Sequence, residues 1–245
     1  MAKQTQALAK YDAELAALAE AAAQQEANTG GGQFFSLRGG QLKLNDSPLP
    51  GNEMAVVILD SVLENVYYGE DFDPENPMSP KCYAFGRDEE KLAPHEEAEQ
   101  KQSTTCAECE FNKWGSSDKG RGKACRNRRR IAVIPAGTLK NGAFTAYDDV
   151  GAFEKASVAY LNVPPTSINA YGAYVKQLAT ALRRPPVGVF TKVGVVPDPK
   201  TQLKVTFEAL SPVPNALLGA ILKRGKGQQA LTVFPYPKGE VRPAK

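Results

Sequence analysis

The chain of 245 residues, 26.4 kDa, is long enough to bury a hydrophobic core in one large domain or in one to two ordinary ones. Its hydrophobic fraction of 42% and charged fraction of 23% exclude a wholly disordered chain, and no run of about 18 apolar residues offers a membrane-spanning helix. The net charge of +3 conceals an asymmetry, because residues 111–130 hold eight lysines and arginines against one aspartate, whereas residues 70–110 hold twelve acidic residues against four basic ones. Concentrated positive charge is typical of proteins with an anionic partner, nucleic acid first, and a solvated charged face is the plainer alternative.

The start of the chain predicts a separate N-terminal segment. Residues 6–27 are rich in alanine and place apolar residues at spacings of three and four, which predicts a helix with a narrow apolar stripe. The three glycines at 30–32 end this helix and form a linker. No basic stretch followed by an apolar one precedes it, so we expect no secretory signal. We therefore predict a helix and linker over residues 1–32 and one domain over residues 33–245.

The remainder of the chain predicts mainly strands. Alternating or continuous apolar runs bounded by turn residues predict a strand or hairpin at 34–45, a long kinked strand at 53–68, strands at 130–136 and 157–163, and a hairpin of strands at 187–196 and 202–210. Apolar residues at helical spacing predict helices at 166–182 and 215–224. Five or six strands with one helix before the last hairpin predict a mainly β fold with some α structure, an OB-like Greek-key barrel.

All four cysteines lie in a segment of little periodicity, residues 81–127. In the reducing compartment that we expect for this chain, clustered cysteines are more often metal ligands than disulfides. The Cys-x-x-Cys turn at Cys106 and Cys109 places two thiolates on one side of a tetrahedral ion. The alternatives are a redox pair at these two residues, or His95 in place of one ligand. We predict an inserted structural zinc site, in which Zn²⁺ supplies folding free energy to a segment with few large apolar residues and is held by Cys82, Cys106, Cys109 and Cys125.

A basic run with a single tryptophan spans and follows the last two cysteines. Cations neutralise phosphates, and an exposed aromatic ring can stack on a base. The alternative for Trp114 is that it packs on the cysteine segment as a miniature core. Side chains alternate along a strand, so only one of the adjacent Tyr67 and Tyr68 should face outward, and at most two of the three arginines at 128–130 can face one ligand. The candidate nucleic-acid-binding residues are Arg38, Tyr67, Tyr68, Lys113, Trp114, Lys119, Arg121, Lys123, Arg126, Arg128, Arg129 and Arg130.

Four short motifs are distinctive: Phe-Phe-Ser-Leu-Arg-Gly-Gly from position 34, the Cys-x-x-Cys followed by Trp-Gly-Ser, Gly-Lys-Ala-Cys-Arg-Asn-Arg-Arg-Arg from position 122, and Asn-Val-Pro-Pro-Thr-Ser from position 162. With them, residues 33–245 resemble the single-stranded DNA-binding proteins of tailed bacteriophages that carry a zinc-binding insertion in an OB-fold. The resemblance implies binding of displaced single strands during phage DNA replication, recombination or repair, in the cytoplasm of the infected host cell. Many such proteins end in an acidic tail, and this chain does not, which puts partner recruitment by the tail in doubt.

We therefore expect a sequence-independent binder of single-stranded DNA, without a membrane association. Replication or recombination proteins are further expected partners, as is a second copy of the chain through the N-terminal helix. The alternative is a zinc-ribbon transcription or polymerase accessory factor that uses the acidic region and the N-terminal helix. We expect no enzyme and no catalytic residues, because metal-dependent nucleases gather carboxylates and Asp148-Asp149 is the only compact acidic pair in the basic half.

Overall fold

The computed structural model describes residues 33–45, 47–69, 79–118 and 120–227, together with Leu18 and Tyr236. The chain divides into two units, Met1–Gln33 and Phe34–Lys245, and the elements described below belong to the second, apart from the first residue of β1. The predicted N-terminal helix and its glycine linker lie outside the described residues, except for Leu18, which is helical. Within the described part of the chain, no helix combines the length and the apolar character needed to cross a membrane.

Two long antiparallel strands, β4 (Glu53–Tyr67) and β6 (Arg126–Pro135), form the centre of the sheet. Both contain a continuous run of β-branched and apolar residues, a composition that favours strands covered on both faces. The register of their pairing shifts between Ile58 and Asp60. Such a bulge bends the strand that carries it, and it accounts for the kink that the sequence predicts in this region.

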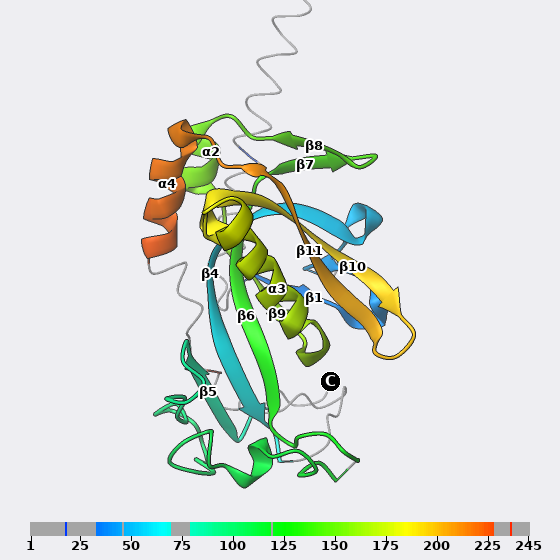
Figure 1. Ribbon diagram of the computed structural model, residues 1–245, viewed down its shortest axis with the longest axis vertical. Helices are drawn as coiled ribbons and strands as arrows, with labels where there is room; N and C mark the ends of the chain where they lie inside the picture. The colour runs from blue at the N-terminus through cyan, green and yellow to red at the C-terminus, as the bar shows by residue number, and fades with distance from the viewer. Residues whose placement is uncertain are drawn as a thin grey trace, which may run out of the picture. The chain divides into compact units, whose positions relative to one another are not determined.

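Further strands extend this pair into a curled sheet. Strand β10 (Val189–Asp198) pairs with the first part of β4 and with the edge strand β11 (Gln202–Pro212), while β9 (Ala159–Val163) pairs with β6. The strand order is β11-β10-β4-β6-β9-β1-β2-β3, and β5 pairs with the second part of β4. The sheet forms a half-barrel (Figure 1), which confirms the prediction of a mainly β, barrel-like fold. The short strands are β1 (Gln33–Ser36), β2 (Lys43–Leu44), β3 (Ser47–Pro48) and β5 (Cys82–Gly86).

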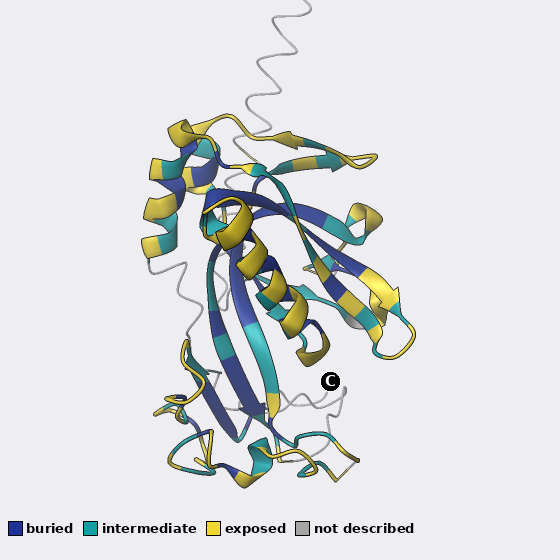
Figure 2. Ribbon diagram, viewed as in Figure 1, coloured by how far each residue is buried: buried dark blue, intermediate teal, exposed yellow. Residues whose placement is uncertain are grey.

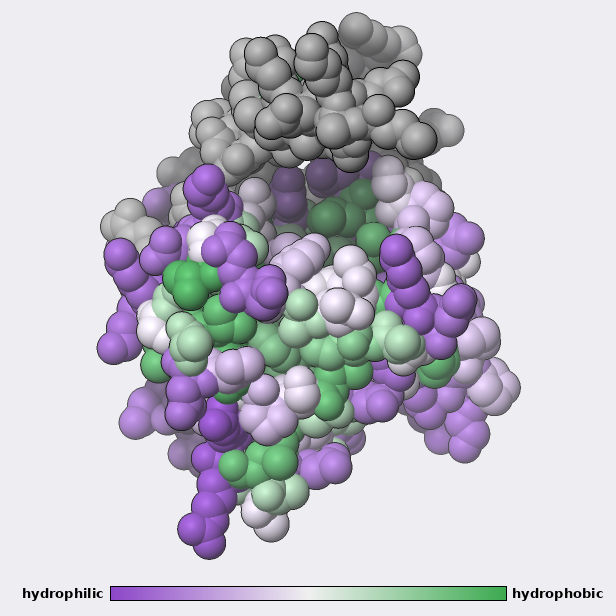
Figure 3. Space-filling view, turned by 90° about the horizontal axis from the view of Figure 1, so that it is seen from above, coloured by the Kyte–Doolittle hydropathy of each residue, from purple (hydrophilic) through white to green (hydrophobic). Residues whose placement is uncertain are grey.

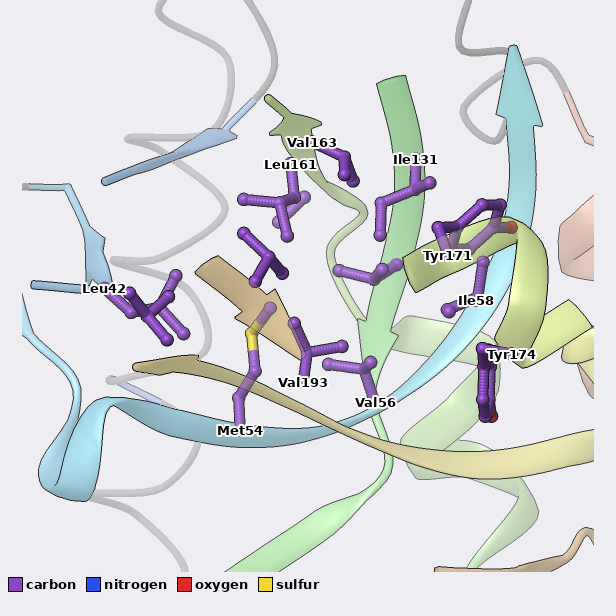
Figure 4. Packing of buried hydrophobic residues seen from close by; sticks show 14 of the residues in the cluster. Leu42, Met54, Val56, Ile58, Ile131, Leu161, Val163, Tyr171, Tyr174 and Val193 are labelled. Carbon is purple, nitrogen blue, oxygen red and sulfur yellow. The ribbon is translucent and has the colours of Figure 1, made fainter. Parts of the chain in front are cut away.

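Helix α3 (Pro165–Ala181) covers one face of the sheet. Proline at its first position favours a helix start, because the missing N–H has no intrahelical partner there in any case. Its side chains Tyr171, Tyr174 and Leu178 recur at spacings of three and four and are buried against the strands. The hydroxyl of Tyr174 forms a hydrogen bond of 2.6 Å with Oγ1 of the fully buried Thr191, so these core hydroxyls are paired. Figure 4 shows this core, which includes Met54, Val56, Ile58, Ile131, Leu161 and Val193.

The opposite face of the same half of the sheet carries a second core. Phe153 of α2 (Val150–Lys155) and Ile221 of α4 (Asn215–Lys226) are fully buried there against Phe190 of β10. In this half, β4 and β6 are therefore excluded from water on both faces, as their dark parts in Figure 2 show. Figure 3, seen from above relative to Figure 1, shows that some hydrophobic residues remain on the surface among hydrophilic ones.

The sequence did not predict α2 or the hairpin of β7 (Gly137–Lys140) and β8 (Ala143–Ala146). A signal for the hairpin exists, because Asn141 and Gly142 both adopt positive φ, as a two-residue hairpin turn requires. A signal for α2 exists in Asp149, whose carboxylate accepts hydrogen bonds from the first backbone N–H groups of the helix at 3.1 Å. Single turns of 3-10 helix lie at Arg38–Gly40, Pro50–Asn52, Glu110–Asn112 and Pro186–Gly188.

The two long strands continue past both cores, at the end away from α2 and α4 (Figure 1). There β5 pairs with β4 from Leu63 to Tyr67, and the loops of the cysteine segment follow it. Neither β5 nor the first residues of β6 were predicted. In β6 the reason is that an arginine-rich start to a strand shows no apolar alternation. This extension of the sheet carries the described residues that the sequence marks for chemistry.

Candidate nucleic-acid interface

The four cysteines line one small cavity at this end of the sheet, with a volume of about 20 Å³. All four are free thiols and at most 9% exposed. Cys82 begins β5, and Cys125 precedes β6 and donates its backbone N–H to the carbonyl of Phe111 at 2.8 Å. The backbone N–H of Cys106 donates to Leu92 at 2.8 Å. Strand ends and backbone hydrogen bonds thus bring together the cysteines that are spread along the segment.

The prediction of a zinc site is nevertheless wrong. No group of three or more His, Cys, Asp or Glu side chains among the described residues is arranged to hold a metal ion. Without a metal two of the four thiols stay protonated at neutral pH, because burial raises the pKa of Cys106 to about 11 and that of Cys125 to about 12. His95 does not replace a ligand, since its ring stacks on Tyr83 and its Nδ1 accepts the backbone N–H of Glu97.

Packing and amide hydrogen bonds hold the cysteine segment instead. The rings of Tyr67 and Phe111 stack with their centroids 4.3 Å apart. The side-chain amide of Asn127 donates to the side-chain oxygens of Asn65 and Asn112, at 2.6 and 2.9 Å. These contacts attach the loop to both long strands. They stabilise the segment in the place of the predicted zinc ion. A small apolar cluster adds to this stabilisation, formed by Ala84, Leu92 and Cys106 with Leu63 packed against them.

The arginines at the start of β6 point to both faces of the sheet, as the alternation of a strand requires. Arg130 is 1% exposed and forms a buried ion pair with Glu64 of β4, so its guanidinium is not on the exposed surface. Arg129 points to the other face, where its guanidinium lies 5.5 Å from the ring centroid of Tyr171 and donates to Ser61 at 3.3 Å. Both arginines are therefore engaged within the fold.

Arg126 and Arg128 share the face of Arg130 but lie nearer the end of the strand, where Arg126 is exposed and Arg128 is partly exposed. The guanidinium of Arg126 lies 5.6 Å from the ring centroid of Tyr68. The neighbouring Tyr67 faces the cysteine cavity and is covered by Phe111. The structure thereby distinguishes the two tyrosines, and it is Tyr68 that combines partial exposure with a cation beside its ring.

Trp114 is 79% exposed, which excludes the alternative that it packs as a miniature core for the cysteine segment. Nζ of Lys123 lies 5.8 Å from its ring centroid and donates to Asn112 at 3.2 Å. Lys113, on the same loop, forms an exposed ion pair with Glu110 at 2.5 Å. The loop thus presents an open aromatic face with a cation over it.

Three other predicted nucleic-acid-binding residues contribute less to the description of this surface. Arg121 is exposed on the loop. Lys119 and the side chain of Arg38 lie outside what the structure describes, although the backbone of Arg38 begins a 3-10 turn. The set with at least partial exposure therefore consists of two ring–cation contacts, Tyr68 with Arg126 and Trp114 with Lys123, together with Arg121 and Arg128.

Sequence reasoning did not predict that aromatic rings gather around Arg130. The guanidinium carbon lies 4.5 Å from the ring centroid of Phe85, 5.5 Å from that of Phe34 and 5.6 Å from that of Tyr236. The alternation of Tyr83 and Phe85 along β5 offers a weak signal for part of the cluster. Nothing local marks Tyr236, which lies 106 positions from Arg130 in the sequence.

Comparisons with protein-family models, with curated proteins and with solved structures each found no significant match. The resemblance to phage single-strand binders therefore stays a prediction from the sequence motifs.

Cys106 and Cys125 should be alkylated slowly in the folded protein at pH 8. The thiolate is the reactive species, and at the raised pKa values only about one thiol in a thousand or fewer is ionised. Iodoacetamide labelling followed by peptide mass spectrometry should show rates at least about tenfold below those of the same chain in guanidinium chloride. Equal rates for the folded and unfolded chains would contradict the burial of these thiols.

Proposed function

We propose that this protein binds single-stranded DNA without regard to base sequence, and that its domain is an OB-type barrel. The observation that carries the proposal is the pair of ring–cation contacts at one end of the sheet, Tyr68 with Arg126 and Trp114 with Lys123. Each contact offers a ring face for a base and a cation for a neighbouring phosphate. Trp114 is the largest exposed aromatic surface among the described residues, at 79%.

The order of the strands supports the OB assignment. With β4, β6, β9, β10 and β11 taken as the first to fifth strands, the spatial order is fifth, fourth, first, second, third. OB-folds are partly open five-stranded barrels that bind oligonucleotides through their second and third strands and through the loops between strands one and two and between strands four and five. Tyr68 and Trp114 lie in the connection from the first strand to the second, and Arg126 begins the second strand.

The chemistry of these residues favours single strands over duplex. A ring can stack only on a base whose face is uncovered, and every base has such a face, so stacking requires no particular sequence. The exposed or partly exposed cations of residues 111–130, Arg121, Lys123, Arg126 and Arg128, add an attraction for phosphates that is equally indifferent to sequence. Together with the sequence motifs, this supports a role in phage DNA replication, recombination or repair.

The other expected properties follow from this proposal and remain predictions: a non-enzymatic role, replication or recombination proteins as partners, and self-association through the N-terminal segment. The accessory-factor alternative loses its main support with the zinc site, because a zinc ribbon needs a metal.

Replacing Arg126 and Arg128 together by alanine should flatten the salt dependence of binding. On single strands the logarithm of affinity falls with the logarithm of salt by about 0.7 per phosphate contact, so losing two contacts should reduce the slope by about 1.4. Titrations of an oligonucleotide at several salt concentrations measure this. The matched control is Lys223→Ala with Lys226→Ala on α4, which removes the same charge elsewhere. Equal changes of slope in the two double variants would place the phosphate contacts elsewhere.

Replacing either Tyr68 or Trp114 by alanine should weaken binding at every salt concentration and leave the slope unchanged. A stacked base contributes about 1–3 kcal/mol, which corresponds to a loss of affinity of about 5-fold to 150-fold. The phenylalanine variants keep a ring and should retain most of the affinity. Fluorescence anisotropy of a labelled oligonucleotide gives these affinities. Alanine and phenylalanine variants that bind equally well would show that stacking does not contribute.

A further inference from the structure

Tyr236 lies in a box of rings and charge at the extended end of the sheet. The plane of its ring is within 10° of that of Phe85, at a centroid distance of 6.2 Å, and Tyr83 meets it edge-on at 5.1 Å. The guanidinium carbon of Arg130 lies 5.6 Å from its centroid. A flat ring held by a parallel ring and a guanidinium is the environment that proteins offer to an unpaired base.

The hydroxyl of Tyr236 donates a hydrogen bond of 2.5 Å to Oε1 of Glu64. Arg130 contacts the same oxygen, whereas the other oxygen, Oε2, has no hydrogen-bond partner among the described residues although Glu64 is fully buried. Burial and the charge of Glu64 raise the pKa of Tyr236, so its hydroxyl remains a donor. The carboxylate that receives the Tyr236 hydroxyl therefore has unused acceptor capacity.

This box lies on the same face of the sheet as the candidate phosphate contacts. Glu64 stands directly opposite Phe85 of β5 on one side and opposite Arg128 of β6 on the other. Residues directly opposite in antiparallel strands share a face, and Arg126, two positions from Arg128, shares it too. A DNA strand whose phosphates contact these two arginines passes beside the box.

We propose that Tyr236 occupies a subsite for one unpaired nucleobase, and that DNA displaces it on binding. The proposal rests on the single-strand-binding function proposed above. A base supplies what the tyrosine supplies, a flat ring for Phe85 and Arg130 and a donor for Glu64. Each of the four bases carries an N–H donor on its pairing edge, so the subsite adds affinity without adding sequence preference. Tyr236 then competes with DNA for this face.

The first test uses the unmodified full chain. Tyrosine nitration by tetranitromethane, read at Tyr236 by peptide mass spectrometry, is compared with and without a saturating oligo-deoxythymidine of about 20 nucleotides, longer than the 4–16 that one OB-fold covers. Nitration of Tyr236 should rise at least about fivefold when the oligonucleotide binds, while Tyr68 should become protected. Oligonucleotide binding that leaves Tyr236 as protected as before would overturn the subsite and leave the proposed function intact.

The second test compares the affinity of the variant Tyr236→Ala with that of Tyr147→Ala, which removes an exposed tyrosine after β8. Removing the tyrosine ring from the subsite should strengthen oligonucleotide binding on the order of tenfold. The reason is that molecules with Tyr236 in the subsite, which cannot bind a base there, no longer reduce the fraction of protein that is competent to bind. Tyr147→Ala should bind as the unmodified chain does. Unchanged or weaker binding by Tyr236→Ala would overturn the competition. A failure of both the unmodified chain and Tyr236→Ala to bind would overturn the function and the subsite together.

Discussion

The ion pair between Glu64 of β4 and Arg130 of β6 joins the two long strands beyond the hydrophobic cores. Both side chains are at most 2% exposed, and removing one partner of such a pair costs about 3–5 kcal/mol, because the other charge stays buried alone. Phe34 and Phe85 lie against the guanidinium, which brings β1 and β5 to the same point. The pair thereby fixes the part of the sheet from which the ring–cation contacts extend.

One half of the sheet forms the folded scaffold, and the other half carries the candidate interface. In the half covered by α3 on one face and by α2 and α4 on the other, the strands are apolar on both sides and form the scaffold. In the other half, polar and aromatic side chains accompany a smaller apolar cluster, and the surface offers cations and rings. The continuity of β4 through both halves means that the scaffold sets the position of the candidate interface (Figure 1).

Elements with strong apolar periodicity were predictable from sequence. Helix α3 and the strands β4, β10 and β11 lie within a few residues of their predicted ranges, because burial of one stripe or face determines them. Strand β6 begins earlier than predicted because residues 126–129 pair with the second part of β4, which is distant in the sequence. The zinc prediction failed because zinc ligands and buried thiols have the same spacing in sequence, and only the three-dimensional arrangement separates them. Tyr236 was beyond prediction, because its partner Glu64 lies 172 positions away.

Photochemical cross-linking tests most directly whether the extended end of the sheet is the nucleic-acid surface. The full chain is bound to an oligonucleotide that carries 5-bromouracil, irradiated, digested and mapped by mass spectrometry. Cross-links are expected in the peptides that contain Trp114, which is exposed, and Tyr68, which is partly exposed, each beside a cation. Cross-links confined to α2, α4 or the β7–β8 hairpin, at the opposite end of the long strands, would contradict this assignment of the nucleic-acid surface.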